Sequence, residues 1–287
     1  MTPEYAVRPT PAPIESQEVH EFEAKVSQAQ ARQMESEGKT RTVRAGERLW
    51  GFDIPGIVQR LVPVTQRPNL FYVARLTQNK DPNAAALADG RIYVTSGMLN
   101  YLAERGSRED ELAFVLAHEL AHTNAQHLLQ RYEYLQQQSL VAGLIDVGLA
   151  AATRGATGTA SQIGSLARDA VSLVQDVNAS GYSQQQELEA DQLGMRYLLK
   201  AGYNPEAALA MVEDFARFDQ PAIPFLRTHP VTELRADYLR RYLRDLEGWK
   251  ASAGDELQRL RDAQKLYPAG STSWKNLQQQ IDSFDRR

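Results

Sequence analysis

The feature that most constrains this sequence is a pair of histidines spaced four residues apart in an apolar stretch. Within Glu111–His127 (ELAFVLAHELAHTNAQH), apolar residues surround the polar ones, which predicts a buried helix. On such a helix His118 and His122 project about 40° apart, one turn from each other. A buried helix with two histidines and a glutamate on it needs a compensating partner. The residues that bury it are Leu112, Phe114, Val115, Leu116 and Leu120.

A metal ion is the partner that this spacing favours. Two imidazoles placed in this way can bind one Zn²⁺ at about 2.0–2.1 Å each. Glu119 stands about 100° around the helix, beside the metal but badly placed to be a third ligand. It can instead accept a proton from a metal-bound water and pass it to a leaving amine. The alternative is that His118 and His122 are only hydrogen-bonded in a protein core.

The composition restricts the third ligand to histidine, aspartate or glutamate, because the chain has no cysteine and only 5 histidines in 287 residues. A helix is expected over SQQQELEADQLGMRYLLKAG, ending near Gly202. On it Glu187 and Asp191 share a face, which suits a ligand and a carboxylate that accepts the free N–H of a ligating imidazole, expected to be His118. Glu189 points about 200° away from Glu187 and is expected to be a solvated surface charge. The alternative is that all three simply form a solvated acidic face.

Three motifs in one order then carry a family resemblance. They are H-E-L-A-H at residues 118–122, E-L-E-A-D-Q-L-G at 187–194 and T-H-P-V-T-E-L-R at 228–235. With them the chain resembles the gluzincin metalloproteases that include the CAAX-prenyl endopeptidases and the HtpX heat-shock proteases. The resemblance covers Trp50 to Leu243. It implies a zincin-like fold and one Zn²⁺ per chain.

The resemblance also implies roles for single residues. It makes His118, His122 and Glu187 the zinc ligands, Glu119 the general base and Asp191 the carboxylate behind a ligand.

Further roles follow from the late motif and from the region before the first. The resemblance places His229 near the metal, where it either stabilises the oxyanion or blocks the open coordination site; the alternative is a helix-start turn. Arg235 either orients catalytic groups or simply pairs with a carboxylate. The remaining histidines have other expected roles: His127, about 140° from His122 on a continuous helix, misses the metal and is structural, and His20 is exposed.

The same resemblance implies a substrate-binding strand. Residues 83–87 form a turn and residues 90–95 an edge strand beside the cleft, to which a substrate adds main chain to main chain. The substrate-binding residues expected on this basis are Asn83, Arg91, Ile92, Tyr93 and Val94.

Length and local patterns predict the organisation. At about 150 residues per domain, 287 residues correspond to one large or two small domains. Residues 1–47 are expected to form an extended tether, with prolines at 9, 11 and 13, followed by a helix over 16–37. Residues 48–247 form the metalloprotease domain, with a helix starting near Arg48 and a sheet of two or three strands. Residues 248–287 form a helical extension. The expected class is α+β, predominantly α-helical.

Charge and hydropathy bear on the setting. The formal net charge is −4, too mild for a polyanion partner, so nucleic acid is not expected. The longest weakly polar run, Leu140–Ala152, falls short of the roughly 20 apolar residues of a spanning helix, although it could touch a membrane surface. The first residues lack the features of a secretory signal, so an export signal would lie outside the given sequence. Residues 153–165 are a candidate lid, or an ordinary surface loop.

These observations favour a zinc endopeptidase that cleaves extended segments of unfolded or membrane-associated proteins. The resemblance is closest to soluble exported bacterial members, which places the chain in the periplasm and in envelope protein quality control. One alternative is a zinc-binding chaperone or assembly factor with a latent site, for which the glutamine-rich helices leave room. Another is a non-peptidase hydrolase with a small closed pocket.

Overall fold

The computed structural model describes residues 10–135, 166–217 and 223–285. The chain folds into two compact units. The larger unit runs to Ala236, and the C-terminal unit begins at Asp237. The expected lid at 153–165 and the apolar run Leu140–Ala152 lie outside the described residues. No helix among the described residues combines the length and the apolar character needed to span a membrane.

The larger unit contains one small sheet with four strands in the order β1-β2-β4-β3. Strands β2 (Val73–Thr77) and β4 (Arg91–Thr95) pair in parallel, while β1 (Thr40–Thr42) and β3 (Ala84–Ala86) add antiparallel at the two edges. The expected two or three strands are therefore an undercount. Both edge strands have three residues each, too few to show an alternating pattern in the sequence.

The sheet topology corrects the expected substrate strand. Strand β4 lies between β2 and β3, so its backbone is already paired on both sides. Arg91, Ile92, Tyr93 and Val94 therefore cannot accept an added strand, and the last three are fully buried. The edge strand is β3, within the segment expected to be a turn.

Helices make up most of the remaining structure, so the α-rich α+β class is confirmed. The helix predicted near Arg48 begins later, at Ile54, where Asp53 caps it by accepting from the Gly56 N–H at 2.9 Å. The helices with defined bounds are α1 (Gln17–Ser36), α2 (Ile54–Leu61), the short 3₁₀ helix η1 (Val62–Val64), α3 (Ser96–Glu104), α4 (Glu109–Asn124), α6 (Leu166–Ser180), α7 (Gln184–Lys200), α8 (Glu206–Phe215), α9 (Pro224–Thr228), α10 (Glu233–Lys265) and α11 (Thr272–Asp285). Residues 127–135 are also helical.

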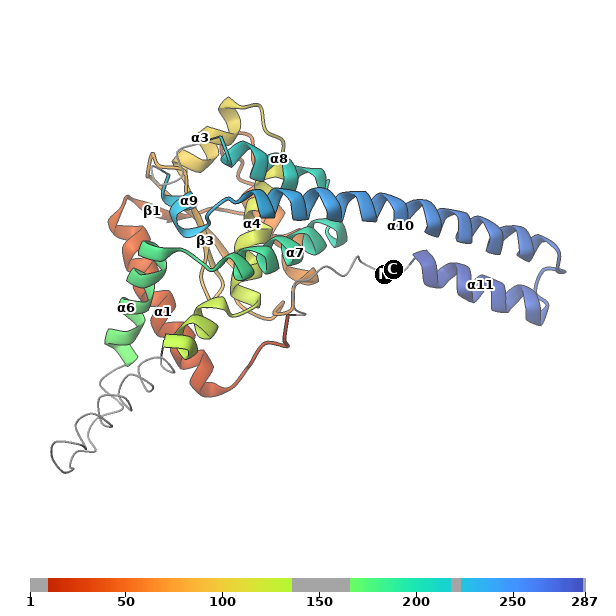
Figure 1. Cartoon of the computed structure of the whole chain (residues 1–287), viewed down its shortest axis with the longest axis horizontal. Helices are drawn as coiled ribbons and strands as arrows, with labels where there is room; N and C mark the ends of the chain where they lie inside the picture. The colour runs from red at the N-terminus through yellow and green to blue at the C-terminus, as the bar shows by residue number, and fades with distance from the viewer. Residues whose placement is uncertain (1–9, 136–165, 218–222, 286–287) are drawn as a thin grey trace, which may run out of the picture. The chain divides into compact units, whose positions relative to one another are not determined.

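Helix α4 is the centre of the larger unit. It packs against α7, α8, α2 and β3, and every residue from Leu112 to Asn124 is buried (Figure 1). Helix α7 approaches it closely at Gly194, where an added Cβ would lie 3.3 Å from the backbone nitrogen of His118. A glycine at this crossing lets the two backbones come together, which brings the acidic residues of α7 over the histidines of α4.

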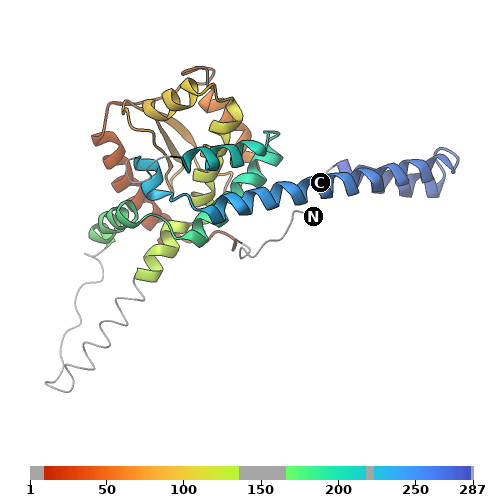
Figure 2. The ribbon, with the colours of Figure 1, turned by 45° about the horizontal axis from the view of Figure 1, so that its top comes forward.

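The C-terminal unit contains most of α10 and all of α11. The helical extension expected over 248–287 consists of the end of α10 and all of α11, joined through residues 266–271, where Gly270 has a positive φ of 81° (Figure 2). Gln264 ties the helices together by donating to the Trp274 carbonyl and to Gln278. Helix α10 begins at Glu233, and the predicted domain boundary at 247 falls inside it. The three-domain division stays a prediction.

Candidate active site

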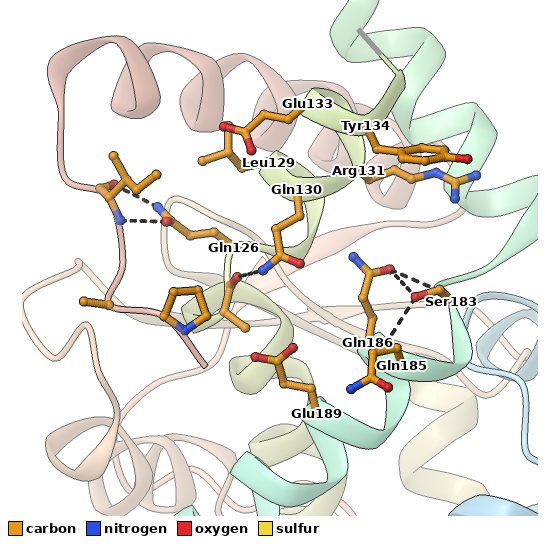
Figure 3. Close-up of a pocket in the computed structure, with 14 residues that line it drawn as sticks. Gln126, Leu129, Gln130, Arg131, Glu133, Tyr134, Ser183, Gln185, Gln186 and Glu189 are labelled. Atoms are coloured by element: carbon orange, nitrogen blue, oxygen red, sulfur yellow. Dashed lines mark hydrogen bonds between the residues drawn. The ribbon is translucent and has the colours of Figure 1, made fainter. Parts of the chain in front are cut away.

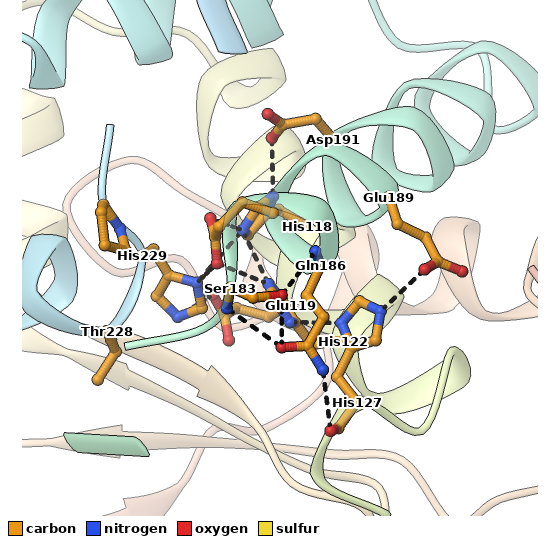
Figure 4. Close-up of polar contacts among 12 residues, drawn as sticks. His118, Glu119, His122, His127, Ser183, Gln186, Glu189, Asp191, Thr228 and His229 are labelled. Carbon is orange, nitrogen blue, oxygen red and sulfur yellow. Dashed lines mark hydrogen bonds and ion pairs between the residues drawn. The ribbon is translucent and has the colours of Figure 1, made fainter. Parts of the chain in front are cut away.

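Four buried side chains from separate parts of the chain meet beside α4. His118 and His122 come from α4, Glu187 from the first turn of α7, and His229 follows α9 (Figure 4). One potential ligand atom from each of the four lies within 4.8 Å of all the others. The sequence motifs that supplied these residues therefore converge in space.

The distances within this cluster fit a metal ion. The Nε2 atoms of His118 and His122 lie 3.1 Å apart, and the two carboxylate oxygens of Glu187 each lie 3.3 Å from one of them. Ligands bound tetrahedrally at about 2.0–2.1 Å are separated by about 3.3 Å. Two histidines and a carboxylate also form a ligand set that zinc commonly takes. The residues present thus fit a zinc ion.

His229 occupies the remaining side of the cluster. Its Nδ1 lies 3.1 Å from Glu187 Oε1 and 3.3 Å from His118 Nε2, at the same spacing as the other ligand atoms. The loop that carries it is held by a hydrogen bond from the Tyr182 N–H to the Thr228 carbonyl, 2.9 Å long. Gly181 permits this approach, because a Cβ there would lie 2.7 Å from the Arg227 carbonyl oxygen.

Glu119 is buried between the cluster and the sheet. One carboxylate oxygen lies 3.3 Å from His229 Nε2, and the Ala86 backbone of β3 hydrogen-bonds to the same side chain. Burial raises the pKa of Glu119 above its ordinary value, while His229 and His118 oppose the rise. A raised pKa suits a general base, because it makes the carboxylate a better proton acceptor.

Asp191 and Arg235 support one side of the cluster. Asp191 Oδ1 lies 3.0 Å from His118 Nδ1, and Arg235 donates to both Asp191 oxygens at 2.7 and 2.8 Å. Arg235 also pairs with Glu187 at 2.6 Å. Burial disfavours the charged form of His118, but the carboxylates of Glu187 and Asp191 outweigh it and raise the pKa of this histidine to about 9. Burial lowers the pKa of His122 well below its usual value, which keeps that imidazole neutral.

Two expectations about neighbouring residues are wrong. His127 was expected about 140° from His122 and clear of the metal; it does lie outside the ligand cluster, but its rotation was wrong, because the Nδ1 atoms of the two rings lie 2.8 Å apart. The reason is that α4 ends at Asn124 and Gln126 takes a positive φ of 53°, which turns the chain back. Glu189 was expected at the surface, yet it is only 7% exposed and lies 3.4 Å from His127 Nε2.

The strained residue Gln126 is held by its own side chain. A non-glycine residue in the left-handed region costs about 1–3 kcal/mol and persists where its surroundings fix it. Here the Gln126 amide donates to the Ile14 carbonyl and to Glu23, and its oxygen accepts from the Ile14 N–H at 2.8 Å. Arg67 is buried beside it and binds Glu23 through two hydrogen bonds of 2.7 Å.

A narrow cavity of about 70 Å³ lies between the cluster and β3. Asn83, which was predicted to bind substrate, lines it together with all three residues of β3. Glu119 and His229 line it from the cluster side, so the edge strand and the candidate acid–base group face the same space. The other lining residues are Gln30, Gln33, Met34, Leu87, Val174, Val177, Tyr182 and Thr228.

Comparison with known proteins identifies the family. The family model described as "Peptidase family M48" matches residues 53–243, which is more than half of the chain. The chain belongs to peptidase family M48. This family consists of metalloproteases, in agreement with the resemblance seen in the motifs. The matched region contains every residue of the cluster.

Several curated relatives are similar over part of their length. The chain is 31% identical to the beta-barrel assembly-enhancing protease of Escherichia coli (strain K12) over 166 residues, which cover 56% of this chain and 32% of the relative. It is 28% identical over 200 residues to the mitochondrial metalloendopeptidase OMA1 of Schizosaccharomyces pombe, covering 69% of this chain and 52% of the relative. The metalloprotease LoiP of Escherichia coli (strain K12) is 28% identical over 165 residues, which cover 56% of this chain and 58% of the relative. The matched part therefore spans from about a third to somewhat over half of these relatives.

Proposed function

We propose that this chain is a zinc-dependent endopeptidase that cleaves extended or unfolded protein segments. The observation that carries the proposal is the convergence of His118, His122 and Glu187 at tetrahedral ligand spacing, with Glu119 and the edge strand β3 beside them. Membership of peptidase family M48 supports it.

The proposed ligands are His118, His122 and Glu187, with one Zn²⁺ per chain. When bound, zinc supplies Lewis-acid chemistry, polarising a peptide carbonyl and activating water. Glu119 acts as the general base, since its buried carboxylate stands beside the cluster and can move a proton from water to the leaving amine. Asp191 and Arg235 orient His118 and Glu187 through the contacts described above.

His229 has a position that suits a resting state. Its Nδ1 stands among the ligand atoms, so in this conformation it occupies the site that a catalytic metal keeps for water or substrate. We infer that His229 fills this fourth position until substrate arrives. Its Nε2 atom also contacts a carboxylate oxygen of Glu119, the proposed base, so in this conformation His229 engages that oxygen in place of water.

Substrate is proposed to bind along β3, by adding a strand to its free edge. Among the described residues, β3 pairs with no strand other than β4, which leaves one edge without a strand next to Glu119. The Ala86 backbone already bonds Thr123 and Glu119, and the Ala84 N–H bonds the Asn83 side chain, so an added strand would replace these bonds. A cavity of about 70 Å³ holds only a few water molecules, so a peptide enters when the walls move apart. Those walls are α1 and α6, which pack together through Phe22, Val26, Leu173 and Val174.

The proposed setting is protein quality control in the bacterial envelope, with the chain exported to the periplasm. The support comes from relatives, since one is named for enhancing beta-barrel assembly. The proposed partners are unfolded or membrane-associated protein substrates, bound with or without peripheral contact to a membrane.

The test is cleavage of an unfolded substrate such as casein by the wild-type chain and by Glu119→Gln, with bound zinc measured in both. We expect the wild type to cleave and Glu119→Gln to lose at least about 100-fold in rate, because proton transfer by a positioned base contributes about 10²–10⁴-fold. Both proteins should retain zinc. If both hold zinc and neither cleaves, the peptidase proposal is wrong and a zinc-stabilised chaperone or assembly factor replaces it.

A further inference from the structure

The two candidate histidine ligands each have a second ring nitrogen that faces away from the cluster. For His118 this nitrogen meets a carboxylate, Asp191, directly. For His122 it meets another imidazole, because His122 Nδ1 lies 2.8 Å from His127 Nδ1. The far nitrogen of His127, Nε2, lies 3.4 Å from a carboxylate oxygen of Glu189 (Figure 4). A chain of three side chains therefore stands behind His122.

The protons in this chain can be arranged in only one way if His122 binds a metal. A ligating His122 keeps its Nε2 lone pair for the metal and carries its proton on Nδ1. His127 Nδ1 must then accept that proton's hydrogen bond and carry no proton of its own. The one ring proton that His127 then carries resides on Nε2, 3.4 Å from a carboxylate oxygen of Glu189.

We propose that His127 and Glu189 are positioning residues that fix the tautomer and the ring orientation of His122. Glu189 orders the proton of His127, and His127 in turn accepts from His122, so the carboxylate acts on the ligand through one intervening ring. The inference rests on the proposed function, since it takes His122 as a metal ligand.

The backbone around His127 is built for this contact. A continuous α4 would carry His127 away from His122, and the left-handed residue Gln126 returns it. Gln126 is held in that conformation by its bonds to Ile14 and Glu23. From the opposite side, Gln186 of α7 donates to the His127 carbonyl at 3.2 Å. Strain that the surroundings maintain is expected where a side chain must be aimed.

The outer end of the chain is less enclosed than its inner end. Glu189 lines a cavity of about 680 Å³ between α7, residues 125–134 and the segment Pro11–Ile14 (Figure 3). His127 itself is fully buried. Because Glu189 borders this cavity and reaches His127 only through a contact of 3.4 Å, its influence on His122 should be smaller than that of His127.

The direct test is the protonation of His127 in the zinc-loaded wild-type chain, read from long-range ¹⁵N NMR spectra of histidine-labelled protein. We expect the His127 proton on Nε2 and a bare Nδ1. A proton on His127 Nδ1 would overturn the inference, because that ring could not then accept from His122.

Three variants separate positioning from packing. His127→Leu removes both nitrogens, and we expect zinc affinity, measured by competition with a chromophoric chelator, to fall about 10- to 100-fold. His127→Asn offers an amide oxygen near the former Nδ1 and should recover most of that loss. Glu189→Gln keeps an acceptor without the charge, and a fall of about two- to tenfold is expected. Equal zinc affinity in wild type and His127→Leu contradicts the inference.

The matched control is Glu133→Gln, an exposed carboxylate that lines the same cavity and touches neither histidine. It should leave zinc affinity unchanged. If His127→Leu fails to fold, as judged by circular dichroism, the NMR assignment and Glu189→Gln still decide the outcome. A wild-type chain that binds no zinc would instead overturn the proposed function, whereas a zinc-binding wild type with unaffected variants overturns this inference alone.

Discussion

The two histidines of α4 are the same residue type one turn apart, yet the protein supports them differently. Behind His118 stands Asp191, at 3.0 Å, neutralised by two hydrogen bonds from Arg235. Behind His122 stands His127, at 2.8 Å, followed by Glu189 at 3.4 Å beside a cavity. One support is a charge-balanced pair in the core, and the other is an imidazole followed by a carboxylate that borders a cavity.

The two histidines differ in whether the carboxylate behind them needs a cation. A carboxylate in the core needs a cation, and Arg235 supplies it to both Asp191 and Glu187. The side chains behind His122 need no such cation, because their one carboxylate, Glu189, lies at the end farther from the cluster. We therefore expect the His118 side to depend on charge and the His122 side to depend on the geometry of hydrogen bonds.

The largest expected effect comes from removing Arg235, the cation that pairs with the carboxylates beside His118. In the metal-free protein, Arg235→Met should lower the free energy of unfolding by about 3–5 kcal/mol, because it removes the guanidinium from two buried carboxylates and leaves them only histidine partners. Urea unfolding measures the change. The control is Arg240→Met, which replaces an exposed arginine of the same helix and should leave the free energy of unfolding within about 0.5 kcal/mol of the wild type. A loss below about 1 kcal/mol for Arg235→Met would mean that the carboxylates are neutralised in some other way.

The next effect compares the carboxylates at the two ends. Asp191→Asn should lower zinc affinity about 10- to 100-fold, since Asp191 contacts the ligand directly and its charge holds Arg235. Glu189→Gln, acting through His127, should lower it less. Chelator competition on both variants gives the ratio. Equal losses, or a larger loss for Glu189→Gln, would show that the two supports do not differ as their geometry indicates.

Much of the site was visible in the sequence because helix periodicity is regular. The i and i+4 spacing placed His118 with His122 and Glu187 with Asp191, and the structure brings both pairs to one cluster. The same periodicity failed at His127, because one left-handed residue after the helix end cancels the rotation that a helix would impose. The positive φ of Gln126 depends on its tertiary contacts with Ile14 and Glu23, which no local pattern shows.

The sheet marks a second limit of the sequence. Residues 90–95 were expected to form an edge strand, but a strand pattern in the sequence does not say whether the strand is central or at an edge. The edge strand β3 consists of three alanines, which have little strand propensity and no alternation. Its position depends on long-range pairing with β4 and on contact with α4, where Thr123 donates to the Ala86 carbonyl.

The most direct test of the metal site is the zinc content per chain after loading and extensive dialysis. The predicted result is one zinc in the wild type and in Glu119→Gln, and little or none in Glu187→Gln, which removes a carboxylate ligand from the centre of the cluster. A wild-type chain without zinc, or a Glu187→Gln variant that holds it as tightly as the wild type, would contradict the assignment of these residues as a metal centre.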